Sequence, residues 1–277
     1  MNNQENISVI GCGWLGLPLA IDLVKKGYQV KGSTTSQSKI ETLKNNAIDP
    51  YLIHFSKNSE EPDSEILNSG ILIINIPPGR RSEEGATNYR IMADYFYKVI
   101  PDSSVQKIIL VSSTSVYNDI NSTVFEADKH LPESDAGKLL LEVENQFLSI
   151  KNKKVIILRL CGLTGPGRDP ARFFKNKNFI PNGLAPINLV HLDDVIGVIL
   201  NIISDENASG IYNCCSTSHP TKDEFYSIAS KLAGNKIPDF ILEKKMWKEV
   251  ASLRIQKELG YKFKYPDLLE WLNNGQL

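Results

Sequence analysis

The stretch ISVIGCGWLG, residues 7–16, decides the fold. Its first part, Ile7–Ile10, is a short apolar run that predicts a buried strand. The second part is a G-x-G-x-x-G pattern, and it opens a helical pattern over Leu15–Lys26. Gly27 follows that pattern and suits the left-handed position after a helix end. A glycine turn between an N-terminal strand and a helix is typical of dinucleotide-binding folds.

The three glycines of this loop have separate physical roles. Gly11 permits the tight turn, Gly13 lets the backbone approach a pyrophosphate, and Gly16 lets the helix pack closely on the strand. The N-terminus of the helix adds unpaired N–H groups and a positive dipole end. We therefore expect the whole loop to bind the cofactor, Trp14 and Leu15 included. The alternative is a glycine turn without a ligand, which we disfavour because three glycines destabilise a folded chain unless something requires them.

Strand and helix patterns alternate over the first 160 residues. Strands are predicted at Ile7–Ile10, Tyr28–Lys31, Ile71–Ile76, Lys107–Val111 and Val155–Leu160, and helices at Leu15–Lys26, Asn88–Val99 and Lys138–Ile150. Such alternation produces βαβ units with right-handed crossovers. The predicted fold class is therefore α/β: a Rossmann doubly wound parallel sheet with a small C-terminal substrate lobe.

The pattern is less regular after Gly162. A glycine- and proline-rich loop covers residues 162–170, and further strands are predicted at Ile187–Leu192 and Ile211–Cys215, with helices at Asp193–Ser204, Thr221–Leu232 and Lys244–Glu258. We expect residues 1–162 plus 187–215 to form the NAD(P)-binding Rossmann domain. Residues 163–186 plus 216–277 would form the smaller substrate lobe.

The residues at the end of the second strand should determine whether NAD or NADP binds. An NAD site carries Asp or Glu about 20 residues after the loop, to bind the ribose 2′-hydroxyl. Here Ser33, Thr34 and Thr35 stand at that place, followed by Ser36, with Lys39 close by. Hydroxyls and a cation can bind a 2′-phosphate, so we expect NADP, with NAD as the alternative. The same hydroxyls can also cap the next helix.

The end of the predicted strand Ile71–Ile76 also faces the ligand side of such a sheet. Ligands bind at the carboxyl ends of the strands in open α/β folds. We therefore expect Asn75 and Pro77 to line the cofactor channel. Arg80 lies nearby in the sequence, although it could equally be an exposed loop charge.

Composition excludes several other classes of protein. The formal net charge is −1, so bulk electrostatics suggest neither a nucleic acid nor a membrane surface as partner. The polar N-terminus does not resemble a signal peptide, and the longest apolar stretch, Val195–Ile203, is too short to cross a bilayer. The four cysteines and four histidines lack metal-ligand spacing. We expect a cytoplasmic protein with reduced, buried thiols, no metal and a small-molecule substrate, as a monomer or homodimer.

Four later segments resemble the extended short-chain dehydrogenase/reductases, the superfamily of NAD(P)-dependent epimerases and dehydratases. They are ILVSSTSVY at residues 109–117, LRLCGLTGPGR at 158–168, NLVHLDDV at 188–195, and GIYN at 210–213 followed by Pro220 and Thr221. The Gly-Trp-Leu-Gly loop and the Ser-Ser-Thr-Ser-Val-Tyr segment are similar to the atypical YeeZ-like subgroup. The resemblance covers roughly residues 7 to 230 and implies an NAD(P)-dependent oxidoreductase or epimerase acting on a small polar or sugar-nucleotide substrate.

The sequence departs from this family at its catalytic pair. The family uses a Tyr-x-x-x-Lys pair on one helix for acid–base chemistry. Aligning Lys138 with the family lysine places Ser134 where the tyrosine should be. A serine hydroxyl is a far weaker acid, and Ser134 is better explained as a helix N-cap before Asp135.

Three residues remain as the predicted catalytic set. The resemblance implies that Ser113 occupies the family's upstream serine position and that Lys138 binds the cofactor ribose. We predict that Ser113 and Tyr117 lie around the reacting carbonyl, with Lys138 tuning the site. Tyr117 could instead be a packed aromatic whose hydroxyl finds a backbone partner. The alternative function is a non-catalytic NAD(P)-binding sensor or scaffold that lacks the family tyrosine.

Overall fold

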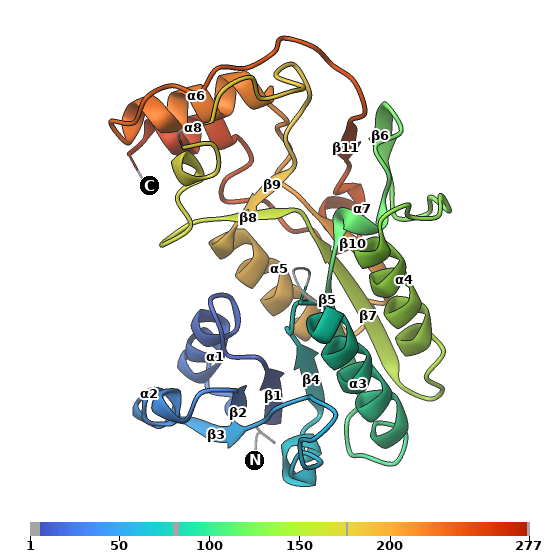
Figure 1. Ribbon diagram of the computed structural model, residues 1–277. Coiled ribbons are helices and arrows are strands. Elements are labelled where there is room, and N and C mark those ends of the chain that lie inside the picture. Colours follow the sequence, from blue (N-terminus) through green and yellow to red (C-terminus); the bar gives the residue numbers. More distant parts are fainter. Residues whose placement is uncertain (1–5, 80–82, 176, 276–277) are drawn as a thin grey trace. The chain divides into compact units, whose positions relative to one another are not determined.

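The computed structural model describes residues 6–79, 83–175 and 177–275 (Figure 1). The chain divides into two compact units. Unit 1 comprises Met1–Val116, Glu133–Leu158 and Ile203–Ile211, and unit 2 comprises Tyr117–Pro132, Arg159–Ile202 and Tyr212–Leu277. Four segments expected in the dinucleotide-binding part group with unit 2 instead: residues 117–132, 159–162, 187–202 and 212–215. The functional division between the two parts stays a prediction.

A seven-stranded sheet has the order β10-β7-β5-β4-β1-β2-β3. Its strands are β1 (Asn6–Ile10), β2 (Gln29–Thr34), β3 (Ile48–Leu52), β4 (Ile71–Ile74), β5 (Lys107–Ser113), β7 (Lys154–Leu160) and β10 (Gly210–Cys214). The β1–β2, β1–β4, β2–β3 and β4–β5 pairs are parallel. The strand order reverses between β1 and β4, which is where open α/β sheets bind their ligands. The predicted Rossmann sheet is confirmed.

The helices of unit 1 cover its part of the sheet. They are α1 (Gly16–Lys25), α2 (Ile40–Asn45), α3 (Glu83–Val99) and α4 (Asp135–Leu148). The chain steps from β1 to β3 in one direction and from β4 to β7 in the other, so right-handed crossovers place α1 and α2 on the opposite face from α3 and α4. Helices α3 and α4 pack side by side (Figure 1).

Burial explains why these segments form these elements. Every residue of β4 is at most 1% exposed, as expected of a strand covered on both faces. In α1, Leu19, Ala20 and Leu23 are 0% exposed, and their spacing of three and four residues puts them on one face. The helix ends before Gly27, which has a φ of +92°. The left-handed glycine predicted after this helix is confirmed.

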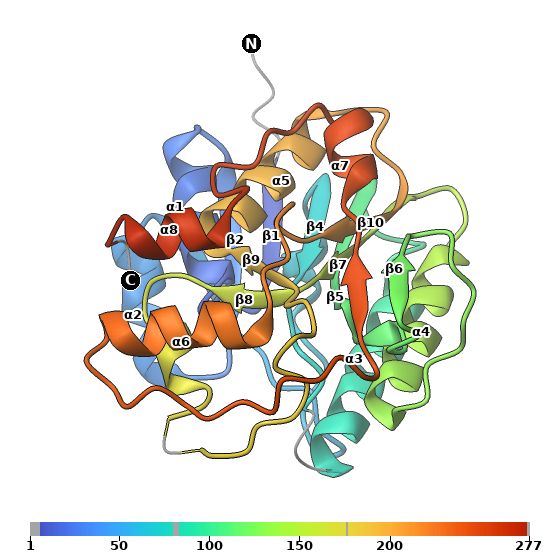
Figure 2. The same cartoon turned by 90° about the horizontal axis from the view of Figure 1, so that it is seen from above.

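Unit 2 contains the remaining small elements. They are β6 (Ser122–Val124), β8 (Gly162–Thr164), β9 (Leu189–His191), α5 (Leu192–Ser204), α6 (Lys222–Leu232), β11 (Lys248–Val250), α7 (Leu253–Lys257) and α8 (Leu268–Asn273). Strands β8 and β9 form one parallel pair, and β6 and β11 form another. Helices α6 and α8 lie together (Figure 2) over a buried core that includes Phe225, Leu268 and Trp271.

The structure corrects two sequence predictions. The helix predicted over Lys244–Glu258 is wrong, because Lys248–Val250 pairs with Ser122–Val124 as a strand and only Leu253–Lys257 is helical. Strand β3 was not predicted, because Asp49 and Pro50 interrupt its apolar pattern. It is the last strand of the sheet, where proline is tolerated.

Candidate functional site

A cavity of about 340 Å³ lies in unit 1, at the carboxyl ends of β1, β2 and β4. Its lining consists of the glycine loop, the end of β2, the residues after β3 and β4, and the first turns of α3. The described lining residues are Gly11, Cys12, Gly13, Ser33, Thr34, Thr35, Lys39, Ile53, Phe55, Asn75, Ile76, Pro77, Gly79, Gly85, Asn88 and Tyr89. This is the place at which the strand order reverses. The cavity therefore occupies the expected ligand position of the fold.

Gly11 forms the turn that lets the loop leave β1. Its φ is +98°, and a Cβ at this position would lie 2.6 Å from the Asn75 carbonyl oxygen. The Asn75 side-chain amide donates to the Gly11 carbonyl at 3.2 Å. Asn75 thus fixes the glycine loop to the end of β4, in addition to lining the cavity.

Gly16 and Gly13 differ in what surrounds them. A Cβ at Gly16 would lie 2.1 Å from the Gly11 carbonyl oxygen, so only glycine fits where α1 meets the turn. A Cβ at Gly13 would meet no atom of the described residues within 4 Å. Gly16 is therefore required by packing. Gly13 instead leaves open space beside an exposed backbone, which fits the cradle that a pyrophosphate needs.

The N-terminus of α1 provides the electrostatic part of this cradle. The N-cap residue is Leu15, and no side chain caps the helix. The first turn also contains no acidic residue. Helix N–H groups without a side-chain cap bind water or an anion, and the helix dipole favours the anion. The glycine loop therefore fits an anionic phosphate group.

The end of β2 presents hydroxyls with different availability. Ser33 is 3% exposed, and its hydroxyl accepts from the Gly11 N–H at 2.9 Å, so it shapes the loop. The Thr34 hydroxyl accepts from the Ser36 N–H at 3.1 Å. Thr35 and Lys39 are exposed and line the cavity. Thr35 and Lys39 are thus the residues of this segment best placed to meet a ligand.

Cys12 lies under the loop. Burial raises the pKa of its thiol to about 12, against the smaller lowering effect of the Ser33 backbone hydrogen bond. The Cys12 sulfur has room because residue 32 is glycine. A Cβ at that position would lie only 2.8 Å from the sulfur. Cys12 is therefore a packed thiol of the loop, as expected for a buried cysteine.

Several residues that line the cavity were not predicted from the sequence. Ile53 and Phe55 follow the unpredicted strand β3, and Asn88 and Tyr89 lie in α3. The signal that could have found them is the parallel sheet itself, since every strand of a doubly wound sheet ends on the ligand side.

A second pair of glycines closes the cavity wall between the loop after β4 and the first turns of α3. A Cβ at Gly79 would lie 2.5 Å from the Gly85 Cα, so the two backbones touch. Arg80, which we expected near the channel, lies outside the described residues.

The predicted cofactor-binding residues divide into two groups. The cavity lining includes Gly11, Gly13, Ser33, Thr34, Thr35, Asn75 and Pro77, but not Trp14, Leu15, Gly16 or Lys138. Leu15 and Gly16 are buried beneath the loop, at the start of α1. Lys138 lies in the first turn of α4, where it is 60% exposed and 3.6 Å from the Asp135 carboxylate.

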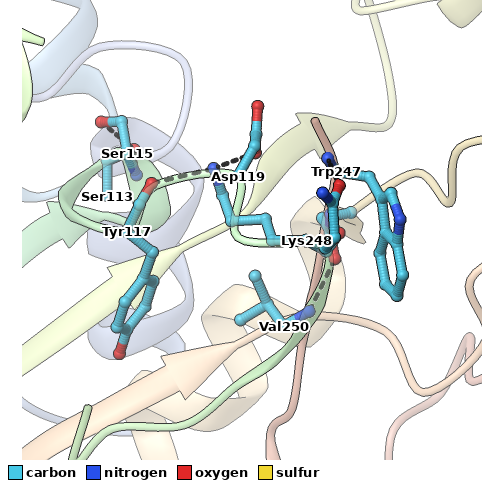
Figure 3. Close-up of polar contacts among 9 residues, drawn as sticks. Ser113, Ser115, Tyr117, Asp119, Trp247, Lys248 and Val250 are labelled. Atoms are coloured by element: carbon cyan, nitrogen blue, oxygen red, sulfur yellow. Dashed lines mark hydrogen bonds and ion pairs between the residues drawn. The ribbon is translucent and has the colours of Figure 1, made fainter. Parts of the chain in front are cut away.

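Ser113 and Ser134 also belong to unit 1. Ser113 ends β5, and its hydroxyl contacts the Ser115 hydroxyl at 3.1 Å (Figure 3). Ser134 accepts from the Gly137 N–H at 3.1 Å and has extended backbone angles. The N-cap role predicted for Ser134 is confirmed, and Lys138 follows it on the exposed side of the helix.

Tyr117 belongs to unit 2, where its hydroxyl has two side-chain partners. It accepts from the Arg159 guanidinium at 2.6 Å and donates to the Asn213 Oδ1 at 2.8 Å. The residue is 4% exposed. Burial raises the pKa of the phenol to about 12, although Arg159 and Asn213 act in the opposite direction. This is close to the packed-aromatic alternative, with side-chain rather than backbone partners.

The segment after Tyr117 is attached to strand β11 through Lys248 (Figure 3). The Lys248 ammonium donates to the Tyr117 carbonyl at 2.9 Å and to the Asp119 carboxylate at 2.8 Å. Asn188 receives the Val250 N–H and donates to the Lys248 carbonyl, each at 2.8 Å. These bonds fix the backbone around Tyr117. They also hold Lys248–Val250 as a strand, within the segment Lys244–Glu258 that was predicted to be helical.

His191 and Asp194 have structural positions in unit 2. Burial lowers the pKa of His191, and its Nδ1 accepts from the Asp193 N–H at 3.1 Å. Asp194 is 0% exposed and accepts from the Tyr261 hydroxyl at 3.0 Å and from the Lys264 and Tyr265 N–H groups at 2.6 and 3.0 Å. Asp194 therefore holds the C-terminal segment, even though burial raises the pKa of its carboxyl.

Replacing Asp194 by alanine is expected to lower the free energy of unfolding by about 3 kcal/mol, because three donors lose a buried charged acceptor. Denaturant unfolding followed by circular dichroism measures this. Asp193→Ala is the matched control, since Asp193 makes a half-exposed ion pair with Lys264 and should change the value by less than about 0.5 kcal/mol. Equal effects of the two substitutions would contradict the role given to Asp194.

Over residues 6–79, 83–175 and 177–275, three or more His, Cys, Asp or Glu side chains nowhere form a group that could hold a metal ion. In that part of the chain, no helix has the length and apolar character needed to span a membrane.

Known proteins resemble this chain over part of its length or over nearly all of it. The NAD binding domain of 6-phosphogluconate dehydrogenase matches residues 6–130. Protein YeeZ of Escherichia coli strain K12 is 36% identical over 272 residues, which cover 96% of this chain and 98% of that protein.

Solved structures extend the likeness in fold. UDP-glucuronic acid 4-epimerase from Bacillus cereus, in complex with UDP-glucuronic acid and NAD, has a TM-score of 0.79 at 18% identity, covering 97% of this chain and 96% of that one. UDP-glucose 4-epimerase from Thermotoga maritima, with UDP-glucose, has a TM-score of 0.77 at 19% identity and covers 96% of each chain. The full-length identity shows that the chain belongs to the YeeZ family, as its glycine loop and Ser112–Tyr117 segment predicted, and its fold is that of the extended short-chain dehydrogenase/reductases.

Proposed function

We propose that the chain binds NADP(H) in the cavity of unit 1 and uses it as an oxidoreductase or epimerase. The observation that carries the proposal is the glycine loop, in which Gly13 leaves open space beside an uncapped helix N-terminus. The match to an NAD binding domain supports a nicotinamide dinucleotide in particular. Such a cofactor supplies hydride transfer when bound.

The preference for NADP rests on the charge of the cavity. Its described lining includes the cation Lys39 and no carboxylate. A carboxylate at the end of β2 would repel a 2′-phosphate, whereas Lys39 and the exposed Thr35 can bind it. NAD remains the alternative, since the solved relative from Bacillus cereus holds NAD.

Lys39→Glu is expected to raise the Kd for NADPH roughly tenfold, or about 1.4 kcal/mol, and to change the Kd for NADH less than threefold. The physical reason is that the substitution replaces a cation beside the 2′-phosphate by an anion. Isothermal titration calorimetry with both nucleotides measures the two values. Lys44→Glu is the control, because Lys44 is an exposed lysine of α2 outside the cavity lining. A similar loss for both nucleotides would contradict NADP selection by Lys39.

The proposed substrate is a small polar molecule, with sugar nucleotides as the favoured class. The likeness to epimerases that hold UDP-glucuronic acid or UDP-glucose supports this class. In the proposed chemistry, Ser113 donates a hydrogen bond to the reacting carbonyl or hydroxyl, and Lys138 binds the cofactor ribose and tunes the site through its positive charge. Catalysis by Tyr117 stays a prediction, and its hydroxyl would first have to leave Arg159 and Asn213.

Ser113→Ala and Lys138→Ala are each expected to reduce kcat at least a hundredfold, the scale of acid–base catalysis. The assay is NADPH oxidation with a substrate found by screening carbonyl compounds and nucleotide sugars. Lys151→Ala is the control, since Lys151 is an exposed lysine just after α4. Retention of full kcat in both variants would contradict the catalytic assignment. Tyr117→Phe in the same assay tests the remaining prediction.

The second candidate is a non-catalytic sensor or scaffold that responds to the state of the bound cofactor. The observation that favours it is Ser134, which caps α4 where the family tyrosine would stand. It predicts tight NADPH binding with no hydride transfer to any screened compound. A partner protein whose affinity is the same with and without NADPH would count against it.

A further inference from the structure

Two cysteines face one another at the ends of neighbouring strands in unit 2. The Cys161 N–H donates to the Cys214 carbonyl at 3.0 Å. Strands β7 and β10 are neighbours in the parallel seven-stranded sheet. In a parallel pair, such a bond places the donor residue opposite the residue after the acceptor. The β8–β9 pair follows the same rule, since the Gly162 N–H donates to the Asn188 carbonyl and Gly162 is opposite Leu189. Cys161 is therefore opposite Cys215.

This register places both thiols on one face of the two strands. Burial, and after it the neighbouring Cys161 thiol, raises the pKa of Cys215 well above its usual value. The Cys215 thiol also donates to the Leu189 carbonyl at 3.6 Å. Cys214 is the neighbour of Cys215 in the sequence, so it points to the other face. Cys214 is thus chemically similar, equally buried and on the wrong side for pairing with Cys161.

The same face carries the partners of Tyr117. Arg159 and Asn213 precede Cys161 and Cys215 by two residues, so they are opposite each other and on the same face. Both bind the Tyr117 hydroxyl. The cysteines are therefore the next pair of opposed residues on this face after Arg159 and Asn213. A change in the distance between the strands at the cysteines would also shift Arg159 and Asn213, which bind Tyr117.

We propose that Cys161 and Cys215 form a reversible disulfide when the protein meets a peroxide. Neighbouring strands lie about 4.8 Å apart, which is within the Cα separation of disulfides but at its short end. The Cβ atoms of opposed residues are somewhat farther apart than a relaxed disulfide holds them. The bond therefore draws the two strand ends closer together and is of the strained, readily reduced kind.

The reaction needs only the peroxide as oxidant. The Cys161 thiolate attacks one peroxide oxygen, so that an S–O bond forms, the O–O bond breaks and the leaving hydroxide becomes water on protonation. The Cys215 sulfur then attacks the sulfenic sulfur of Cys161. The S–S bond forms, the S–O bond breaks, and the departing hydroxide takes the Cys215 proton. The two thiols lose two electrons in total, and the peroxide gains them.

Burial sets the rate of this reaction. Cys161 is 5% exposed and Cys215 is 0% exposed, so the oxidant reaches them only when the strand ends open locally. We therefore expect oxidation over hours rather than seconds. Cys161 reacts first, because it is the more accessible of the two.

The test uses the full chain, treated under native conditions with excess hydrogen peroxide and then denatured and alkylated. The wild type is expected to lose two of its four titratable thiols and the mass of two hydrogen atoms, with full recovery after dithiothreitol. Cys214→Ser should form the same disulfide, since Cys161 and Cys215 remain. Cys161→Ser and Cys215→Ser should each fail to form it.

Peptide mapping of oxidised Cys214→Ser protein without reduction keeps the test decisive even if another variant does not fold. A peptide that joins Cys161 to Cys215 supports the proposal. Four intact thiols after prolonged oxidation, irreversible sulfinic acid alone, or a bond to Cys12 would each overturn it. The result is independent of nicotinamide binding, because the disulfide is measured by mass in the absence of cofactor.

Discussion

Replacing Gly13 by aspartate is expected to raise the Kd for NADPH at least a hundredfold, or about 2.7 kcal/mol, in a chain that still folds. In the part of the chain that the structure describes, no atom lies within 4 Å of a Cβ at Gly13, so the side chain fits in the unliganded protein. The same side chain enters the space proposed for the pyrophosphate, and its charge repels the phosphates. The folded chain itself should tolerate the substitution, because a carboxylate near the start of α1 interacts favourably with the helix dipole. Calorimetric titration and thermal unfolding measure the two properties.

Gly13→Ala separates the steric part of this effect from the electrostatic part. It should weaken NADPH binding less than the aspartate does, and it should also leave Tm unchanged within about 2 °C, the scale of a surface substitution. Unchanged NADPH affinity in Gly13→Asp would place the pyrophosphate elsewhere. A large fall in Tm would instead show that Gly13 is needed for packing.

Gly16→Ala is expected to have the opposite profile, with a loss of folding stability of about 3 kcal/mol or more from overpacking against backbone. The new Cβ would lie 2.1 Å from the Gly11 carbonyl oxygen, so α1 and the turn must separate. A fall in Tm of roughly 10 °C corresponds to this cost in a chain of this size. Differential scanning calorimetry without any nucleotide measures it.

Gly13→Ala serves as the matched control for this second substitution, since it adds the same methyl group three residues away in the same loop. The two variants together assign one glycine to binding and the other to packing. Equal Tm values for Gly16→Ala and Gly13→Ala would refute that division.

The fold could be predicted from the sequence where physical signals were strong. Strand β4 is almost entirely apolar because it is buried on both faces, and Gly27 marks the end of α1 through its left-handed backbone. The N-cap Ser134 was predictable for the same reason, because a helix start needs an acceptor for its N–H groups. These features are local, so the nearby residues suffice to specify them.

Features that depend on distant parts of the chain could not be predicted from local sequence. Strand β3 contains Pro50, and only its place at the edge of the sheet makes that acceptable. Residues around Lys248 look helical, but pairing with Ser122–Val124 makes them a strand.

Some residues of the candidate site could also be recognised from local sequence, whereas others could not. Gly11, Gly13 and the end of β2 were recognisable from one loop and its spacing. Ile53, Phe55 and Tyr89 join the cavity only through the sheet topology. The partners of Tyr117 come from β7 and β10, far along the chain, and no local pattern indicates them.

A calorimetric titration of the purified chain with NADPH, repeated with NADH and with both oxidised nucleotides, tests the central claim most directly. We expect one site per chain, a micromolar or lower Kd for NADPH, and weaker binding of NADH. Absence of measurable binding for all four nucleotides would contradict the account, because the glycine loop would then hold no dinucleotide.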